Sequence, residues 1–460
     1  MDTGIIGPVT VMPKYTEQFG ATSAIVHGLI VSAILIPAAL SAFAAGRAAD
    51  AIGRAKAITF GGLIFGLGAA LEAGAAHLGM FITGRVLEGF GEGLFLGNLA
   101  VYITEISPPR SRGILTSYPQ LMNTIGLTVG FFSCYGSRNV DSSMSWRLPF
   151  VLLSASAFSF AGISWLWLPE SPRWLLVRGR KEEATKAWDV LGVASADREK
   201  VEHEQEMAVI GGSGSVEAQP SEAKDGSGWL AAFAPDVRAR TLLGAFAMGM
   251  QQMSGIDGIL YYAPLLFERA GLSSTKASFL ASGVSAIVIM VASVAALVYQ
   301  DKWGRRHSTI YGGLALSLIM FLIGSLYASS SVHETYGAGR WVVIASIYLF
   351  AVVFCTTWAM GIKTWVAECQ PQRSRSSATN LAYGSNWLTN FLVALTTPVL
   401  LDSSSFGAYF LFGGCTFITA IVCLMWMPET KGKSLEEIEA AFAKKAPGSR
   451  SLLRLMRRPF

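Results

Sequence analysis

Apolar segments long enough to cross a membrane recur along almost the whole chain. The composition agrees with this pattern: 52% of the 460 residues are hydrophobic and only 15% are charged, with a mean hydropathy of +0.44. Soluble domains carry about 25% charged residues, and a helix needs roughly 20 apolar residues to cross the core of a bilayer. The sequence therefore predicts an all-α, polytopic membrane protein.

Apolar runs between charged or turn-rich breaks define eleven complete spans. They cover residues 21–45, 57–76, 80–104, 113–136, 147–168, 241–267, 277–299, 308–328, 341–366, 378–401 and 406–427. A twelfth apolar segment, residues 1–13, is too short to cross a core of about 30 Å at about 1.5 Å per residue.

This pattern predicts four parts of the chain. They are an N-terminal transmembrane half with an incomplete first helix (1–168), a cytosolic helical linker (169–240), a C-terminal transmembrane half (241–427) and a cytosolic tail (428–460). Lys and Arg concentrate in alternate loops, in the linker and in the tail. By the positive-inside rule these regions are cytoplasmic, so we expect a cytoplasmic C-terminus, in a protein of the plasma membrane.

Three loop motifs occur twice, in the same order. The pattern ExxPxRxR at Glu105–Arg112 recurs at Glu368–Arg375, DAIGR at Asp50–Arg54 recurs as DKWGR at Asp301–Arg305, and Pro169–Glu170 recurs as Pro428–Glu429. Three ordered matches predict two similar six-helix halves. Such halves, rocking about a site near the middle of the membrane, are the architecture of an alternating-access carrier.

The charged residues of these repeated loops are candidates for gating. They are Asp50, Arg54, Glu105 and Arg112 in the first half, and Asp301, Arg305, Glu368 and Arg375 in the second. We expect them to pair when the cytoplasmic side is closed and to separate when it opens. The alternative is that they are only interfacial anchors and topology signals, because single exposed pairs contribute little free energy.

Polar side chains inside apolar spans are the candidates for substrate binding. Gln251, Gln252, Asp257, Tyr261 and Tyr262 lie in one apolar span, and neighbouring amides suit a polyhydroxylated ligand because they both donate and accept hydrogen bonds. Further candidates are Gln120, Lys363, Asn386 and Asn390, with Trp358, Trp365 and Trp387 able to stack on a sugar face. Interhelical hydrogen bonding and membrane-interface anchoring of the tryptophans remain the alternatives.

Charged residues within the spans are few. Asp2 lies in the short first segment, and Arg85, Glu88 and Glu92 lie early in the span 80–104. A carboxylate beside an arginine inside a membrane can take up and release a proton, because its pKa depends on whether the arginine is engaged. Glu88 and Glu92, one helical turn apart, are both candidates for this role.

Other classes of function find little support in the sequence. The five cysteines form no CxxC pair and the five histidines show no ligand spacing, so we expect no metal and no disulfide framework. No strand precedes the GFGEG run, which argues against a nucleotide loop. We therefore expect no cofactor, no enzymatic activity and no nucleic-acid partner, and instead a monomer in the lipid bilayer.

These motifs resemble the sugar porter family of the major facilitator superfamily. The resemblance covers nearly the whole chain, through DTGIIGPV, GRVLEGFGEG, YITEISPPRSRG, PESPRWLL, QQMSGIDGILYYAPLLF, GSNWLTNF and PETKGKSLEEIE. It implies twelve helices, a cytosolic helical bundle after the sixth, and carriage of hexoses, pentoses or related polyols by uniport or proton symport. It places sugar contacts at Gln120, Gln251, Gln252, Asp257 and Asn386, and the proton-coupling pair of symporters at Asp2 and Arg85.

The sequence departs from the family pattern in three ways. The chain begins at the aspartate of the first motif, so we expect a truncated first helix and weak transport. Asp257 replaces an asparagine and Lys363 replaces a tryptophan, for which we predict a buried ion pair or, alternatively, an anionic sugar acid as substrate. Ala51 and Ala55 replace arginines of the first-half loop. A non-transporting sugar sensor on the same fold is the remaining alternative.

Overall fold

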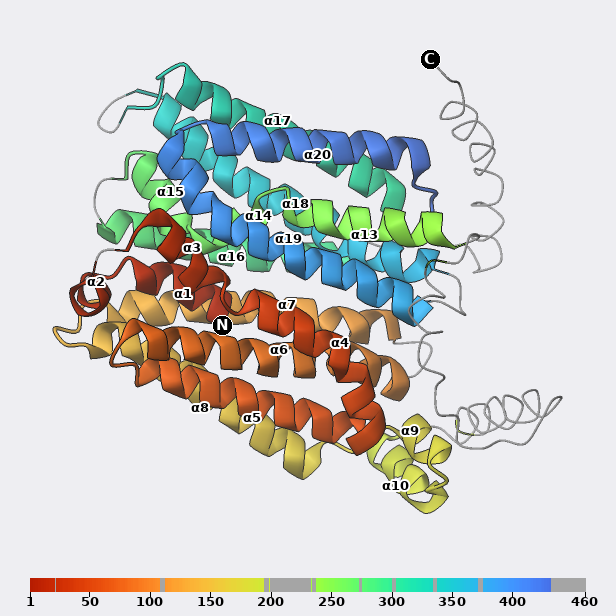
Figure 1. Cartoon of the computed structure of the whole chain (residues 1–460). Helices are drawn as coiled ribbons and strands as arrows, with labels where there is room; N and C mark the ends of the chain where they lie inside the picture. The colour runs from red at the N-terminus through yellow and green to blue at the C-terminus, as the bar shows by residue number, and fades with distance from the viewer. Residues whose placement is uncertain are drawn as a thin grey trace, which may run out of the picture. The chain divides into compact units, whose positions relative to one another are not determined.

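The computed structural model describes residues 1–20, 22–107, 112–193, 198, 233, 237–272, 275–299, 303–333, 337–370 and 375–431. The chain divides into two compact units, Met1–Asp225 and Gly226–Phe460. The described parts of both units consist of helices joined by short loops (Figure 1). An all-α membrane fold, as the sequence predicts, is therefore confirmed.

The first unit contains ten labelled helices. They are α1 (Asp2–Thr10), α2 (Pro13–Phe19), α3 (Ala24–Ser32), α4 (Leu35–Ile52), α5 (Arg54–Ala73), α6 (Leu78–Ile106), α7 (Arg112–Ser137), α8 (Met144–Trp167), α9 (Pro172–Val177) and α10 (Lys181–Leu191). Helix α6 packs against α4 and α5, α5 also packs against α8, and α1 packs against α7. In Figure 1 these helices run side by side within the unit.

Glycines bring α5 and α6 unusually close together. A Cβ atom on Gly68 would lie 2.5 Å from the backbone nitrogen of Glu88, and one on Gly84 would lie 2.6 Å from Cγ of Glu72. Membrane helices use small residues in this way to let two backbones approach. As a result, the two glutamates lie in the contact between α5 and α6.

The second unit contains α13 (Arg238–Gln252), α14 (Ile256–Tyr261), α15 (Ala263–Arg269), α16 (Thr275–Tyr299), α17 (Arg305–Ala328), α18 (Gly339–Cys369), α19 (Arg375–Ser403) and α20 (Gly407–Trp426). Helix α13 packs against α19 and α18, and α17 packs against α20 and α18. These contacts surround α13 with neighbours that supply polar partners for its two glutamines.

The predicted continuous span 241–267 is wrong, because the structure divides it into α13, α14 and α15. Gly255 adopts a positive φ of +83°, and a Cβ atom there would lie 2.6 Å from the ring of Phe412. Pro264 lies in the first turn of α15, where its missing N–H costs nothing. A helix broken in this way frees backbone groups near the polar residues.

Seven helices among the described residues are long and apolar enough to cross a membrane. They are Ala24–Ile52, which joins α3 and α4, then α5, α6 over Leu78–Ile103, α8, α17, α18 and α20. The other predicted spans correspond to α7, α16 and α19 and to the broken segment from α13 to α15. These four are richer in polar residues, broken, or only partly described.

Two short helices follow α8 in the predicted linker region. Helices α9 and α10 share a small hydrophobic core that includes Trp174, Leu175 and Trp188. The indole N–H of Trp174 donates a hydrogen bond to the carbonyl of Asp50 over 3.1 Å. This bond fixes α9 to the end of α4.

Candidate functional site

Three polar side chains of the second unit form one amide cluster: Gln251, Gln252 and Asn386. Gln251 is 1% exposed, and its Nε2 donates to the carbonyl of Trp358 over 2.7 Å. Asn386 on α19 donates to Oε1 of Gln251 over 3.3 Å and to the carbonyl of Met248 over 2.8 Å. Gln252 donates to Oδ1 of Asn386 over 3.1 Å. The sequence candidates from two helices therefore meet inside this unit.

The amide cluster retains acceptors that no described residue satisfies. Oε1 of Gln252 is buried and accepts no hydrogen bond, and the same holds for Oδ1 of Asn390, one turn beyond Asn386 on α19. Buried polar atoms normally have partners. Two unsatisfied acceptors on adjacent helices suit the hydroxyl groups of a ligand.

The remaining candidates of the second unit differ in exposure. Trp387 on α19 is half-buried, whereas Tyr261 on α14 is buried. The hydroxyl of Tyr262 donates to the carbonyl of Ala394 over 2.7 Å, so this tyrosine ties α14 to α19. Tyr262 therefore has a structural role, while sugar contacts of Tyr261 and Trp387 stay predictions.

Asp257 on α14 and Lys363 on α18 are both half-buried and act on each other electrostatically. The side chain of Gln252 lies in hydrogen-bonding reach of Asp257. No direct ion pair joins Asp257 and Lys363 among the described contacts, so the pair predicted from the sequence is not formed in this structure. Asp257 instead extends the amide cluster, and Lys363 adds a positive charge near it.

Two of the three tryptophans proposed for sugar stacking have structural roles instead. Trp358 is fully buried and its indole N–H donates to the carbonyl of Thr309 over 2.9 Å. Trp365 is 1% exposed and donates to the carbonyl of Pro428 over 3.1 Å. Both rings lie within the helix packing of their unit, so their predicted role in stacking is wrong.

Gln120 lies on α7 of the first unit and is half-buried. Pro119 precedes it inside the helix, which removes a backbone donor and loosens the helix locally. The predicted convergence of Gln120 with the amide cluster stays a prediction.

A buried charge cluster occupies the first unit: Asp2, Glu72, Arg85 and Glu88. Nη1 of Arg85 lies 2.5 Å from Oδ1 of Asp2, 3.2 Å from Glu88 and 4.0 Å from Glu72. The side chains of Arg85, Glu72 and Glu88 are all 0% exposed, and that of Asp2 is 12% exposed. The predicted contact between Asp2 and Arg85 is therefore present.

Glu72 is the member of this cluster that the sequence analysis missed. Its signal is the single acidic residue in the apolar run ending LEAGA, which lies inside a predicted span. Glu92, which was expected to act with Glu88, is half-buried and forms no ion pair with the described residues. Glu72, and not Glu92, is thus the carboxylate that accompanies Glu88.

The carboxylates of Asp2, Glu72 and Glu88 lie within 4.8 Å of one another, which is a spacing suited to a metal ion. Nη1 of Arg85, however, lies within 4.0 Å of all three groups. The guanidinium is therefore the cation that these carboxylates surround in this structure.

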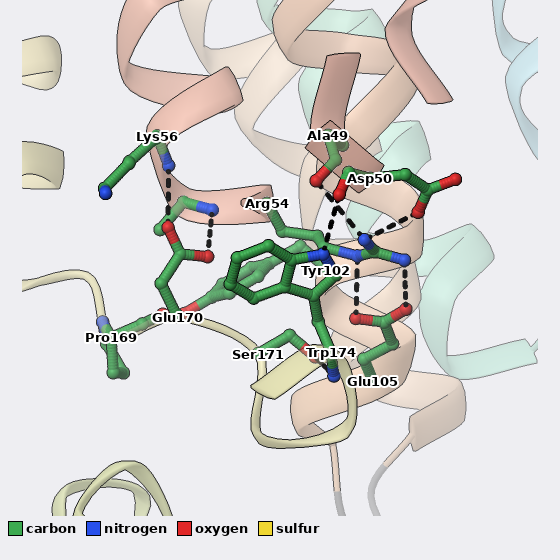
Figure 2. A network of polar contacts seen from close by, with 11 residues as sticks. Ala49, Asp50, Arg54, Lys56, Tyr102, Glu105, Pro169, Glu170, Ser171 and Trp174 are labelled. Carbon is green, nitrogen blue, oxygen red and sulfur yellow. Dashed lines mark hydrogen bonds and ion pairs between the residues drawn. The ribbon is translucent and has the colours of Figure 1, made fainter. Parts of the chain in front are cut away.

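The repeated loop of the first unit forms a polar network at the ends of α4, α5 and α6 (Figure 2). Arg54 lies between two carboxylates, 2.7 Å from Asp50 and 3.3 Å from Glu105. Glu170 accepts hydrogen bonds from the backbone N–H groups of Ala55 and Lys56 over 3.1 and 3.3 Å. A carboxylate at the N-terminus of α5 satisfies free backbone donors and complements the helix dipole.

The described residues of the second unit repeat the arginine–glutamate pair and the glutamate cap of this network. Arg305 lies 3.4 Å from Glu368, and Glu429 accepts from the backbone N–H groups of Arg305 and Arg306 over 2.9 and 3.1 Å. A glycine makes room for each cap: a Cβ atom on Gly304 would lie 2.3 Å from Glu429. The role of both glutamates as helix caps was not predicted from the sequence.

Three of the predicted gating residues cannot be assigned contacts. Asp301 lies outside the described residues, and the side chains of Arg112 and Arg375 also lie outside them. The ion pairs that are described, those of Arg54 and Arg305, each join residues of one unit. Pairing between the two halves therefore stays a prediction.

Comparison with known proteins matches residues 1–442 to the family described as "Sugar (and other) transporter". The low-affinity glucose transporter HXT1 of Saccharomyces cerevisiae is 28% identical, over 96% of this chain and 79% of its own length. The quinate permease of Neurospora africana is 31% identical, over 97% of this chain and 86% of its own length.

Solved structures of the xylose transporter XylE share the fold. The inward-open form from E. coli has a TM-score of 0.76 at 22% identity, covering 96% of this chain and 95% of XylE. A form described as the proton:xylose symporter bound to 6-bromo-6-deoxy-D-glucose has a TM-score of 0.77 at 23% identity, covering 96% of each chain. The family consists of membrane carriers and not of enzymes, as the sequence analysis expected. This chain belongs to the sugar transporter family of the major facilitator superfamily.

Proposed function

We propose that this chain carries a monosaccharide, either a hexose or a pentose, or a related polyol across the membrane by alternating access, coupled to a proton. The proposal rests on the presence of two sites in one chain. A cluster of amides with unsatisfied acceptors lies in one half, and a buried carboxylate held by an arginine lies in the other. The first suits hydroxyl groups, and the second suits reversible protonation.

The amide cluster supports the choice of substrate class. Gln252 and Asn390 present buried oxygens that accept no hydrogen bond from described residues, and each could accept from a sugar hydroxyl. Gln251 is held in place by its bonds to Trp358 and Asn386. Such preorganised polar groups give specificity in a binding site. We propose that Tyr261 and Trp387 also contact the substrate, and that Gln120 of the first unit is a further substrate-binding residue.

The contact between Asp2 and Arg85 supports proton coupling. An ionised Asp2 neutralises Arg85 across the 2.5 Å contact. Protonation of Asp2 would remove that attraction and leave Arg85 to its other partner, Glu88, at 3.2 Å. Breaking one partner of a buried pair is costly unless another takes its place. The protonation state of Asp2 thus changes which contacts hold α1 to α6.

The loop networks support alternating access. Each half has a capped helix, α5 or α17, and an arginine that joins the cap to a glutamate of the next long helix. These bonds make the cytoplasmic end of each half rigid, so that the halves move as bodies. We place the C-terminus in the cytoplasm and the protein in the plasma membrane as a monomer.

An anionic sugar acid is the second candidate for the substrate. Lys363 brings a positive charge toward the amide cluster without a direct ion pair, and a quinate permease is 31% identical to the chain. A carboxylate on the substrate would pair with Lys363, while the amides would bind its hydroxyl groups.

Uptake in yeast cells that lack their hexose transporters tests both candidates. Radiolabelled glucose, xylose, inositol, galacturonate and quinate should be compared with and without a protonophore. Proton symport predicts accumulation of one of the neutral solutes that the protonophore abolishes. Accumulation that the protonophore leaves intact would contradict proton coupling. Uptake of quinate or galacturonate alone, lost in Lys363→Met, would establish the second candidate.

A further inference from the structure

Glu72 is a buried carboxylate that the proposed coupling by Asp2 and Arg85 does not use. It lies in the last turn of α5, next to the end of the helix at Ala73, and its side chain is 0% exposed. Neither of its carboxylate oxygens has a hydrogen-bond donor in the described structure. An ionised carboxylate in such a place would be severely destabilising.

The contact between α5 and α6 places Glu72 beside Glu88. Gly84 leaves the space that Cγ of Glu72 occupies, and Gly68 leaves the space for Cγ and the backbone nitrogen of Glu88. Carboxylate oxygens of the two residues lie within 4.8 Å of each other, and both side chains are fully buried. Two ionised carboxylates this close in a buried site repel each other strongly, which favours a proton on one of them.

The charges around Glu72 lead to the same conclusion. Four neighbouring helices bring charged or titratable groups near Glu72. These groups are Asp2 on α1, Tyr15 on α2, Arg85, Glu88 and Glu92 on α6, and Arg147 on α8. Arg147 is engaged with the carbonyls of Ala73 and Ala75.

Among the described residues, Arg85 is thus the one guanidinium that contacts the three carboxylates of the buried charge cluster. With all three ionised, the cluster would carry two uncompensated negative charges in the membrane interior, which is energetically prohibitive. One proton on Glu72 or Glu88 reduces the excess to a single charge and satisfies an unpartnered oxygen of Glu72. A metal ion would do the same, but Arg85 already lies among the three groups.

We propose that Glu72 and Glu88 share one proton and form a second proton-binding position in the first half, separate from Asp2. Carboxyl groups this close titrate as a pair, and the proton belongs to both. This Glu72–Glu88 pair keeps its proton while Asp2 gains and loses the transported one. The charge cluster then alternates between one excess negative charge and none. The inference deepens the proposed function, because it describes the environment in which Asp2 would couple protons to sugar.

Infrared spectroscopy of the purified chain tests the shared proton without any sugar. Protonated carboxyl groups give a carbonyl stretching band that ionised groups lack, and 13C labelling of glutamate separates glutamates from aspartates. At neutral pH we expect a glutamate band that is lost in Glu72→Gln and also in Glu88→Gln. Glu17→Gln is the matched control, because Glu17 is an exposed residue of the same unit, and its removal should leave the band unchanged.

Survival of the band in either single variant would overturn the sharing of a proton. If neither variant can be purified in folded form, the Glu92→Gln variant decides the question. It should still show a protonated glutamate band at neutral pH, and its absence would contradict the proposal. The infrared measurement needs no substrate, so its result does not depend on the sugar uptake assays. Failure of the shared-proton proposal would likewise leave the proposed sugar transport untouched.

The pH profile of uptake gives a second readout. Loss of the shared proton at alkaline pH puts a second excess charge into the cluster, so uptake by the unmodified chain should fall there. Glu72→Gln removes the group that releases this proton, and the alkaline fall should move to higher pH. An unchanged profile in this variant would contradict the proposed role of the Glu72–Glu88 pair in coupling.

Discussion

The indole N–H of Trp365 donates a hydrogen bond to the carbonyl of Pro428 over 3.1 Å. At the matching position of the first half, the hydroxyl of Tyr102 donates to the carbonyl of Pro169 over 2.8 Å. Each bond fixes the long helix α18 or α6 to the segment that follows its half. Two different side chains thus make the same connection, and the next residue in each segment is the capping glutamate.

Glu429 should make the stability of the protein depend on pH. Burial raises the pKa of Glu429, but hydrogen bonds from the backbone N–H groups of Lys431, Arg306 and Arg305 and from His307 outweigh it, so its pKa is lowered. A lowered pKa in the folded state adds stability above the unfolded pKa, and this stability is lost as pH falls through the folded value. Acidification through that range should therefore lower the melting temperature.

The Glu429→Gln variant tests this pH dependence by thermal unfolding in detergent. It should be less stable at neutral pH by about 1 kcal/mol, the typical contribution of a helix cap, and its melting temperature should change less on acidification. Glu183→Gln serves as the control, since Glu183 is exposed at the start of α10. Identical acid profiles for the unmodified chain and Glu429→Gln would refute the capping role.

A comparison of alanine substitutions at Gly53 and Gly179 separates backbone strain from a steric clash with the capping glutamate Glu170. Both have a positive φ, +106° and +74°, so Gly53→Ala and Gly179→Ala should each strain the backbone by about 1–3 kcal/mol. Only at Gly53 would the new Cβ atom lie 2.4 Å from the carboxylate of Glu170, whereas nothing lies within 4 Å at Gly179. We expect Gly53→Ala to lower both the melting temperature and the uptake rate more. Equal effects of the two substitutions would argue against a role for the cap in transport.

The amide cluster should govern apparent affinity. Gln252→Ala and Asn390→Ala each remove one unsatisfied acceptor that we propose bonds to the sugar. Each such hydrogen bond is worth about 0.5–1.5 kcal/mol, so KM for uptake should rise by about threefold to tenfold. Thr396→Ala is a suitable control on α19, because this exposed hydroxyl bonds only to the carbonyl of Leu392 in its own helix. A KM that neither amide substitution alters would remove these amides from the substrate site.

Substitutions that swap the charges of Asp257 and Lys363 test the electrostatic interaction between the two side chains. Asp257→Lys or Lys363→Asp alone places two like charges in one region and should greatly reduce uptake. The double substitution restores opposite charges at the same positions and should recover part of the activity. A double variant no better than the worse single one would mean that the two residues act independently.

Several parts of this architecture can be read from the sequence because they depend on local patterns. Apolar runs locate the helices, and the repeated loops identify the two halves. The family motifs brought together Gln251, Gln252 and Asn386, and likewise Asp2 and Arg85. The structure places the residues of each group in contact, because helix spacing and a recurring motif both constrain them. Their roles in binding and coupling stay predictions.

Other parts depend on contacts between distant segments and were not predicted. The break at Gly255 arises from the close approach of Phe412 on α20, and no pattern within 241–267 reveals it. Glu72 and Glu88 meet only because Gly68 and Gly84 let α5 and α6 approach. Trp358 looked like a sugar contact until its hydrogen bond to Thr309 placed it inside the helix packing.

Proton movement driven by sugar is the most direct test of the account. The purified chain should be reconstituted into liposomes that contain a pH-sensitive dye, and a gradient of the transported sugar should be imposed without a pH gradient. The account predicts that sugar entry acidifies the interior, and that Asp2→Asn abolishes this acidification while downhill sugar entry continues. Sugar entry through the unmodified chain without any change of internal pH would contradict proton coupling.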